Sequence, residues 1–202
     1  MCGGPVIFQS VLVGLQQSQS SYNPVREAIS SLVYGPYGWL QTASFYVLGF
    51  SILALAATLY FQIKRRFRLA GVAGLALVGA AFTVIGANPA AAAGVQATLT
   101  SLVHVGATIF VAAGFPIACL LLVPSLRGKR HTALRHYTIT VGVSSLLFFT
   151  IGGAILVDRM SLVGLFERVL LLNGQLWAVF VCMQLMWDRM RKKSEAKLSV
   201  AV

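Results

Sequence analysis

The chain has 202 residues, of which 57% are hydrophobic and only 10% are charged, and its formal net charge is +11. Soluble globular domains carry about 25% charged residues, so this composition excludes a protein that covers its surface with charge in water. The basic residues stand in short clusters between apolar runs, which is typical of the signals that orient membrane proteins and disfavours nucleic acid as a partner.

The charge-free intervals predict an all-α, polytopic bundle of six transmembrane helices. The spans are expected at about 3–20, 39–63, 69–87, 97–123, 136–157 and 169–187. They form a single domain over residues 1–193, followed by a polar cytoplasmic tail at 194–202. With about 20 apolar residues needed for each span, there is no room for a separate soluble domain.

The first span is short, because only Pro5–Leu15 is strongly apolar. Either the polar stretch Gln16–Ser21 extends it, or the span begins upstream. The turn-rich segment from Ser30 to Gly38 indicates a loop or a half-helix lying against the membrane before the second span.

The charge-free interval Leu69–Leu126 is too long for one helix and suits the third and fourth spans. Gly86–Pro89 separates them, because these residues favour turns and stop helices. Small residues crowd the third span from Ala70 to Ala81, which predicts a central helix that its neighbours approach closely. A basic loop at Arg127–Arg135 precedes the fifth span, and a short amphipathic linker at 161–168 precedes the sixth.

Lysine and arginine divide unevenly between the two sides of this layout. Thirteen lie at 64–68, at 127–135 and from 189 onward, against three at Arg26, Arg159 and Arg168. Cytoplasmic loops carry the excess of basic residues, so six spans place both termini in the cytoplasm. A five-helix alternative, with the first span at the interface, would place the N-terminus outside.

Two stretches resemble motifs of a known family. Asn23–Leu32 resembles the motif that follows the first helix in the bacterial domain-of-unknown-function family 998, and Gly164–Arg168 resembles the motif before its last helix. His104 falls where that family tends to have a histidine. Where the family often has Phe-Pro-x-Asp, this chain has Ile85–Asn88, and the loss of the acid puts an acid or metal role there in doubt.

That family is similar to the DRAM/Sfk-type six-helix membrane proteins of eukaryotes. The resemblance implies a six-helix fold in the bacterial inner (plasma) membrane. It predicts no particular biochemical activity, because that of the family is not established.

Seven polar residues expected on the outer side are candidate ligand-binding residues. They are Arg26, Glu27, Ser30, Asn88, His104, Glu167 and Arg168. One hypothesis is a pocket open to the outer leaflet, in which the two arginines bind an anionic head group through their planar guanidiniums and His104 or Glu167 polarises it. In the alternative, Glu27, Asp158 and Glu167 pair with Arg26, Arg159 and Arg168 and only brace the loops.

His104 belongs to a polar stripe at four-residue spacing, which runs over Gln96, Thr100, His104 and Thr108. The stripe indicates either a cavity wall or hydrogen bonding between helices. No second histidine stands at a metal-binding spacing, so no metal and no cofactor are expected.

The sequence favours a small, non-enzymatic multi-pass membrane protein. Its partners would be membrane lipids, a second copy of the chain or another membrane protein. Two alternatives stay open. An intramembrane enzyme acting on a lipid or its head group would bring Ser30, His104 and Glu167 together, although no residue is assigned as catalytic. A transporter would show an inverted repeat and helices broken at mid-membrane.

Overall fold

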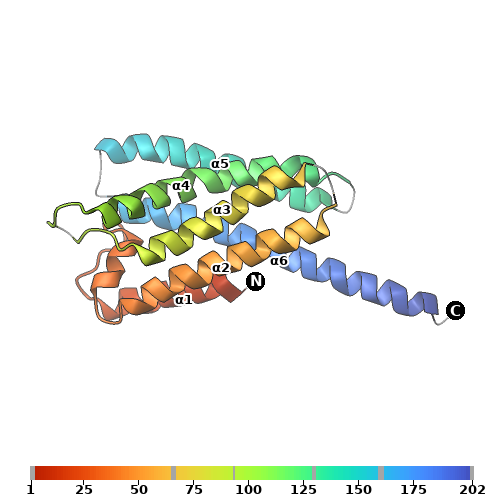
Figure 1. The fold of residues 1–202 in the computed structure, drawn as a ribbon, viewed down its shortest axis with the longest axis horizontal. Coiled ribbons are helices and arrows are strands. Elements are labelled where there is room, and N and C mark those ends of the chain that lie inside the picture. Colours follow the sequence, from red (N-terminus) through yellow and green to blue (C-terminus); the bar gives the residue numbers. More distant parts are fainter. Residues whose placement is uncertain (1–2, 65–66, 93, 129–130, 159–161, 201–202) are drawn as a thin grey trace.

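The computed structural model describes residues 3–64, 67–92, 94–128, 131–158 and 162–200, with side chains omitted for 155–158 and 192–200. Regular structure in these ranges is helical throughout. The helices are α1 (Gly3–Ser18), η1 (Ile29–Tyr34), α2 (Trp39–Gln62), α3 (Arg68–Ala87), α4 (Leu99–Leu122), η2 (Val123–Ser125), α5 (Thr132–Asp158) and α6 (Val163–Val200), where η denotes a 3-10 helix. They form one elongated bundle, beyond which the C-terminal part of α6 projects (Figure 1).

Five helices are long and apolar enough to cross a membrane: α2, α3, α4 with η2, α5, and α6 as far as Arg191. The fold is therefore that of a multi-pass integral membrane protein. Helix α1, the first of the six expected spans, is not among these five. Its 16 residues rise about 24 Å against a hydrocarbon core of about 30 Å, a mismatch that a bilayer can accommodate by local thinning. Helix α1 packs into the bundle through Phe8, Leu12 and Leu15, which are buried.

The connections gather at the two ends of the bundle. One end, the η1 end, holds the 19–38 loop, the 88–98 loop and the start of α6 (Figure 1). The other, the basic end, holds the connection after α2 and the connection from α4 to α5. Six of the seven candidate ligand-binding residues belong to these segments, and the seventh, His104, lies near the start of α4.

Helix α3 is central, as its small residues predict. It packs between α2 and α4 (Figure 1). A Cβ added at Gly79 would lie 3.0 Å from the carbonyl oxygen of Gly49 on α2, and one added at Gly71 would lie 2.7 Å from the backbone of Leu122. Glycine is therefore required at these positions for close packing of the backbones.

Three helix starts differ from the sequence prediction. The fifth helix begins at Thr132, so the basic loop predicted at Arg127–Arg135 is wrong over 132–135. The sixth helix begins at Val163, so the linker predicted at 161–168 is wrong over 163–168, while Ser161 lies outside the described residues. The polar stripe is also wrong at Gln96, because α4 begins only at Leu99. Thr98 caps it with a capping box, in which its hydroxyl accepts from the backbone N–H of Ser101. By contrast, the break at Gly86–Pro89 is confirmed, since α3 ends at Ala87.

Candidate functional site

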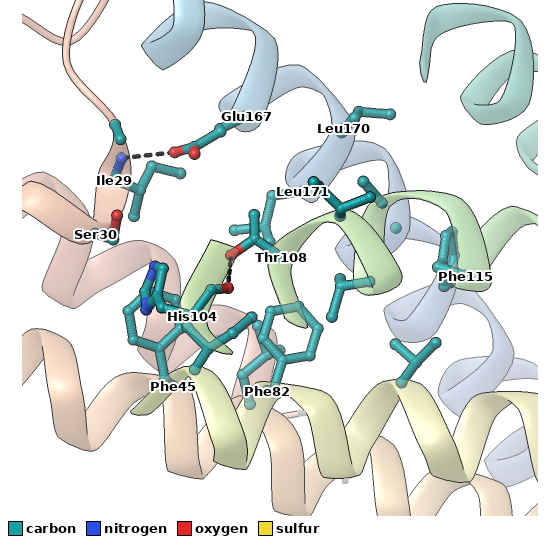
Figure 2. A pocket seen from close by; sticks show the side chains of 18 of the residues that line it. Ile29, Ser30, Phe45, Phe82, His104, Thr108, Phe115, Glu167, Leu170 and Leu171 are labelled. Atoms are coloured by element: carbon teal, nitrogen blue, oxygen red, sulfur yellow. Dashed lines mark hydrogen bonds between the residues drawn. The ribbon is translucent and has the colours of Figure 1, made fainter. Parts of the chain in front are cut away.

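The main feature of the bundle is an elongated internal cavity of about 550 Å³. Its walls come from η1, α2, α3, α4, α5 and α6, and almost all of them are apolar. Figure 2 shows aromatic and aliphatic side chains along the wall, with Phe115 toward one end and Ile29, Ser30 and Glu167 at the other. Ligand sites typically occupy about 300–1,000 Å³ and combine an apolar wall with a few polar groups.

Three polar side chains from distant segments meet at the η1 end of the cavity, while Ser145 and Gln175 line it farther along. Ser30, His104 and Glu167 line it there, although they come from three segments that are far apart in the sequence (Figure 2). Ser30 and His104 are 7% and 5% exposed. The Ser30 hydroxyl has no hydrogen-bond partner among the described residues, so it is available to a ligand.

The orientation of the His104 ring is fixed by a backbone carbonyl. Its Nδ1 lies 2.6 Å from the carbonyl oxygen of Asn88. A carbonyl only accepts hydrogen bonds, so Nδ1 carries the proton, and in the neutral ring Nε2 is left as an acceptor. Asn88 thus contributes its backbone to the site, while its side-chain amide donates to the carbonyl of Val84.

Glu167 links α6 to η1. Its Oε2 accepts a hydrogen bond of 2.8 Å from the backbone N–H of Ile29, the first residue of η1 (Figure 2). That N–H has no partner within its own short helix. The other carboxylate oxygen, Oε1, has no partner in the described part of the chain and belongs to a side chain that lines the cavity.

Arg168 forms a second link, outside the cavity wall. Its guanidinium donates to the carbonyls of Gly164 (2.9 Å) and Glu27 (3.4 Å) and to the hydroxyl of Tyr22 (2.6 Å). The Tyr22 hydroxyl in turn donates to the carbonyls of Glu27 and Ala28. We call Tyr22, Arg168 and these carbonyls the arginine brace. Burial raises the pKa of the Tyr22 hydroxyl above its ordinary value of 10, and Arg168 opposes part of that rise.

The ion pairs predicted between neighbouring acids and arginines are replaced by contacts to the backbone. Glu27 accepts from the backbone N–H of Asn23 at 2.7 Å, Glu167 accepts from Ile29, and Arg168 donates to carbonyls. The reason is that the loop has unpaired backbone groups close to these charges, and a charge-assisted hydrogen bond satisfies both at once. Asp158, whose side chain is not described, and Arg159 lie outside this comparison.

The seven candidates therefore divide into groups with different surroundings. Ser30, His104 and Glu167 line the cavity. Arg168 holds the loop against α6, Glu27 accepts from the Asn23 backbone within the loop, and Asn88 contributes its carbonyl to His104. Arg26 is exposed and does not belong to the cavity wall.

The cavity is open to the side of the bundle. Leu102, Val105 and Ile109 line it, yet they are 60%, 51% and 55% exposed. They lie about one turn apart on the N-terminal half of α4, so one edge of the cavity faces the surroundings of the bundle. In a membrane those surroundings are lipid chains.

The apolar wall and Tyr22 were absent from the sequence-based prediction. Apolar residues facing a cavity have the same pattern as those facing lipid, so no sequence signal separates them. Tyr22 directly precedes the Asn23–Leu32 motif, and its position beside that motif was the one sequence feature that could have pointed to it.

These features define a multi-pass helical membrane protein with a largely apolar internal cavity and a cluster of polar side chains at one end. The chain belongs to the family DUF998, described as a protein of unknown function, which matches it over residues 1–184. Neither the curated proteins nor the solved structures include a match to it.

Proposed function

We propose that this protein binds one hydrocarbon chain of a membrane amphiphile inside the bundle, with the polar head at Ser30, His104 and Glu167. The observation that carries the proposal is a laterally open, largely apolar cavity with Ser30, His104 and Glu167 together at one end; farther along the wall, Nε2 of Gln175 also lacks a partner. An amphiphile has the same division between a long apolar part and a small polar part. Membrane lipid is also the ligand at highest concentration around the opening on α4.

The dimensions of the cavity suit one chain. Its lining on α6 runs from Val163 to Ala178, a rise of about 22 Å. The volume of about 550 Å³ lies within the range of about 300–1,000 Å³ that is usual for the site of one small ligand. An extended chain advances about 1.2 Å per bond, so the cavity accommodates about 16 to 18 carbons.

The orientation belongs to the same proposal. We propose six membrane helices with both termini in the cytoplasm, in the bacterial inner membrane. Two observations support it: the excess of basic residues at one end of the bundle, and the apolar outer face of α1, where Val6, Ile7 and Val13 are 59%, 49% and 50% exposed. An apolar exposed face suits a helix in contact with lipid. The polar mouth then lies on the outer side.

The arrangement favours binding over acyl-transfer chemistry. A Ser-His-acid set needs the acid to orient the histidine, whereas here Nδ1 of His104 contacts the Asn88 carbonyl and Glu167 accepts from Ile29. No hydrogen bond joins Ser30, His104 and Glu167 among the described residues.

Trp177 provides a direct test, because it lines the cavity and is only 1% exposed. The other two tryptophans, Trp39 and Trp187, are 67% and 64% exposed and can be replaced by phenylalanine to leave one reporter. In lipid nanodiscs, a single-chain amphiphile brominated at mid-chain should quench Trp177 fluorescence saturably, since bromine quenches at short range. Quenching that is absent, or that rises linearly without saturation, would contradict the proposal.

A cavity-filling variant supplies the control. Ala112→Phe places a ring into the cavity from α4 and should abolish the saturable quenching. Ala80→Phe adds the same ring at an exposed position of α3 outside the wall and should leave it unchanged. If both variants bind the probe like the parent, the chain lies elsewhere.

A further inference from the structure

The charges at the cavity mouth constrain the head group of the ligand. Among the described residues that line the cavity there is no lysine or arginine, and Glu167 is the sole acid. An anionic head in this position would stand beside the Glu167 carboxyl group, and no arginine or lysine of the described wall is there to pair with it. Such an unpaired charge is costly in an apolar environment.

The two arginines expected to bind an anion are not available at the mouth. Arg168 lies outside the wall, and its two terminal nitrogens are held by two carbonyls and the Tyr22 hydroxyl. Its Nε has no partner among the described residues, and its guanidinium lies 5.5 Å from the centre of the Tyr22 ring. Arg26 is exposed and outside the wall. Recruiting Arg168 would leave the loop carbonyls unpaired.

The remaining hydrogen-bonding capacity at the mouth is mainly accepting. Oε1 of Glu167 accepts, the Ser30 hydroxyl both donates and accepts, and Nε2 of His104 accepts in the tautomer that protonates Nδ1. Each is without a partner in the described structure. A ligand atom that donates hydrogen bonds satisfies two of these groups, whereas a phosphate or carboxylate oxygen satisfies only the serine.

We infer that the cavity selects a single-chain amphiphile whose head donates hydrogen bonds and carries no negative charge, such as a long-chain alcohol. This inference rests on the proposed function, because it names the ligand class of the same cavity. A protonated amine shares the donor chemistry, and the experiment distinguishes the two.

The experiment compares four brominated probes with one 18-carbon chain and different heads: an alcohol, an amine, a carboxylic acid and a phosphate monoester. The readout is the midpoint of Trp177 quenching in nanodiscs at neutral pH. We expect the alcohol or the amine to bind at least about tenfold more tightly than the acid and the phosphate. Whichever of the alcohol and the amine binds more tightly shows which of these two head groups the cavity selects.

Three variants test the assignment residue by residue. Glu167→Gln removes the negative charge and should reduce the discrimination against the acid by about tenfold. Ser30→Ala should weaken the donor probes, whereas Ser31→Ala, whose hydroxyl donates to the carbonyl of Ala28 and which does not line the cavity, should not. Thermal melting of each variant shows that the bundle is intact.

The outcomes separate the two proposals. Saturable quenching with equal midpoints for all four heads, or tighter binding of the acid or phosphate, would overturn the head-group inference and leave the chain-binding function standing. The absence of saturable quenching by any probe would overturn the proposed function itself.

Discussion

The hydroxyl of Tyr22 is a single atom on which the arginine brace depends. It accepts from Arg168 at 2.6 Å and donates to the carbonyls of Glu27 and Ala28 at 3.1 Å each. Tyr22→Phe deletes this oxygen and keeps the ring over which the guanidinium lies. We therefore predict that Tyr22→Phe loosens the loop from α6 without disturbing the apolar core.

The expected loss follows from the contacts removed. Hydrogen bonds to charged groups contribute about 1.5–3 kcal/mol each. Tyr22 and Arg168 are half-buried, so water recovers part of the lost bonding, and a loss of about 1–2 kcal/mol is the reasonable expectation. For a chain of this size that corresponds to a fall of about 2–8 °C in melting temperature.

The assay is thermal unfolding in detergent, with Tyr46→Phe as the matched control. Tyr46 is also half-buried, it stacks on Phe50, and its hydroxyl has no partner among the described residues. Its substitution should shift the melting temperature by less than about 1 °C. Equal shifts in the two variants would refute the role given to the Tyr22 hydroxyl.

Three further predictions concern pH, packing and topology. The pKa of Tyr22 is higher in the folded state than in the unfolded chain, so stability should fall as the pH rises above 10. Tyr22→Phe should lack that part of the fall in thermal melts between pH 8 and 11. Identical pH profiles for the parent and the variant would contradict this prediction. Gly49→Val should lower the free energy of unfolding by about 1–3 kcal/mol, because its Cβ would lie 2.8 Å from the Gly79 carbonyl oxygen. A Cβ at Gly14 meets nothing within 4 Å, so Gly14→Val is the control. Equal melting temperatures for the two variants would refute the close packing. A cysteine at Ser21 should react with a membrane-impermeant maleimide in intact cells and one at Lys64 only after permeabilisation, and the reverse pattern would overturn the orientation.

The fold was largely predictable because membrane helices are specified by length and apolarity. The break at Gly86–Pro89 and the central position of α3 followed from residue types alone. The start of α6 did not, because Glu167 and Arg168 resemble loop residues until their partners are known. Those partners are backbone groups of the 22–29 segment, more than 130 residues away, and pairing at that separation leaves no local pattern.

The site was predictable in part for a similar reason. Ser30, His104 and Glu167 stood out as polar residues near expected lipid, and the structure brings them to one cavity. What the sequence could not show was that Arg168 is engaged by the loop, or that Arg26 is exposed. Both depend on the path of the 19–38 segment, which turns into a 3-10 helix and covers the end of the bundle.

The most direct measurement is a density map of the protein extracted with its native lipid into nanodiscs. The account predicts one rod of density inside the bundle, running beside α6 from the level of Val163 to that of Ala178. Its polar end should contact Ser30 and His104, and no phosphate-sized density should lie at Glu167. A cavity without such density in a map that resolves lipid chains on the outer faces of the helices would contradict the account.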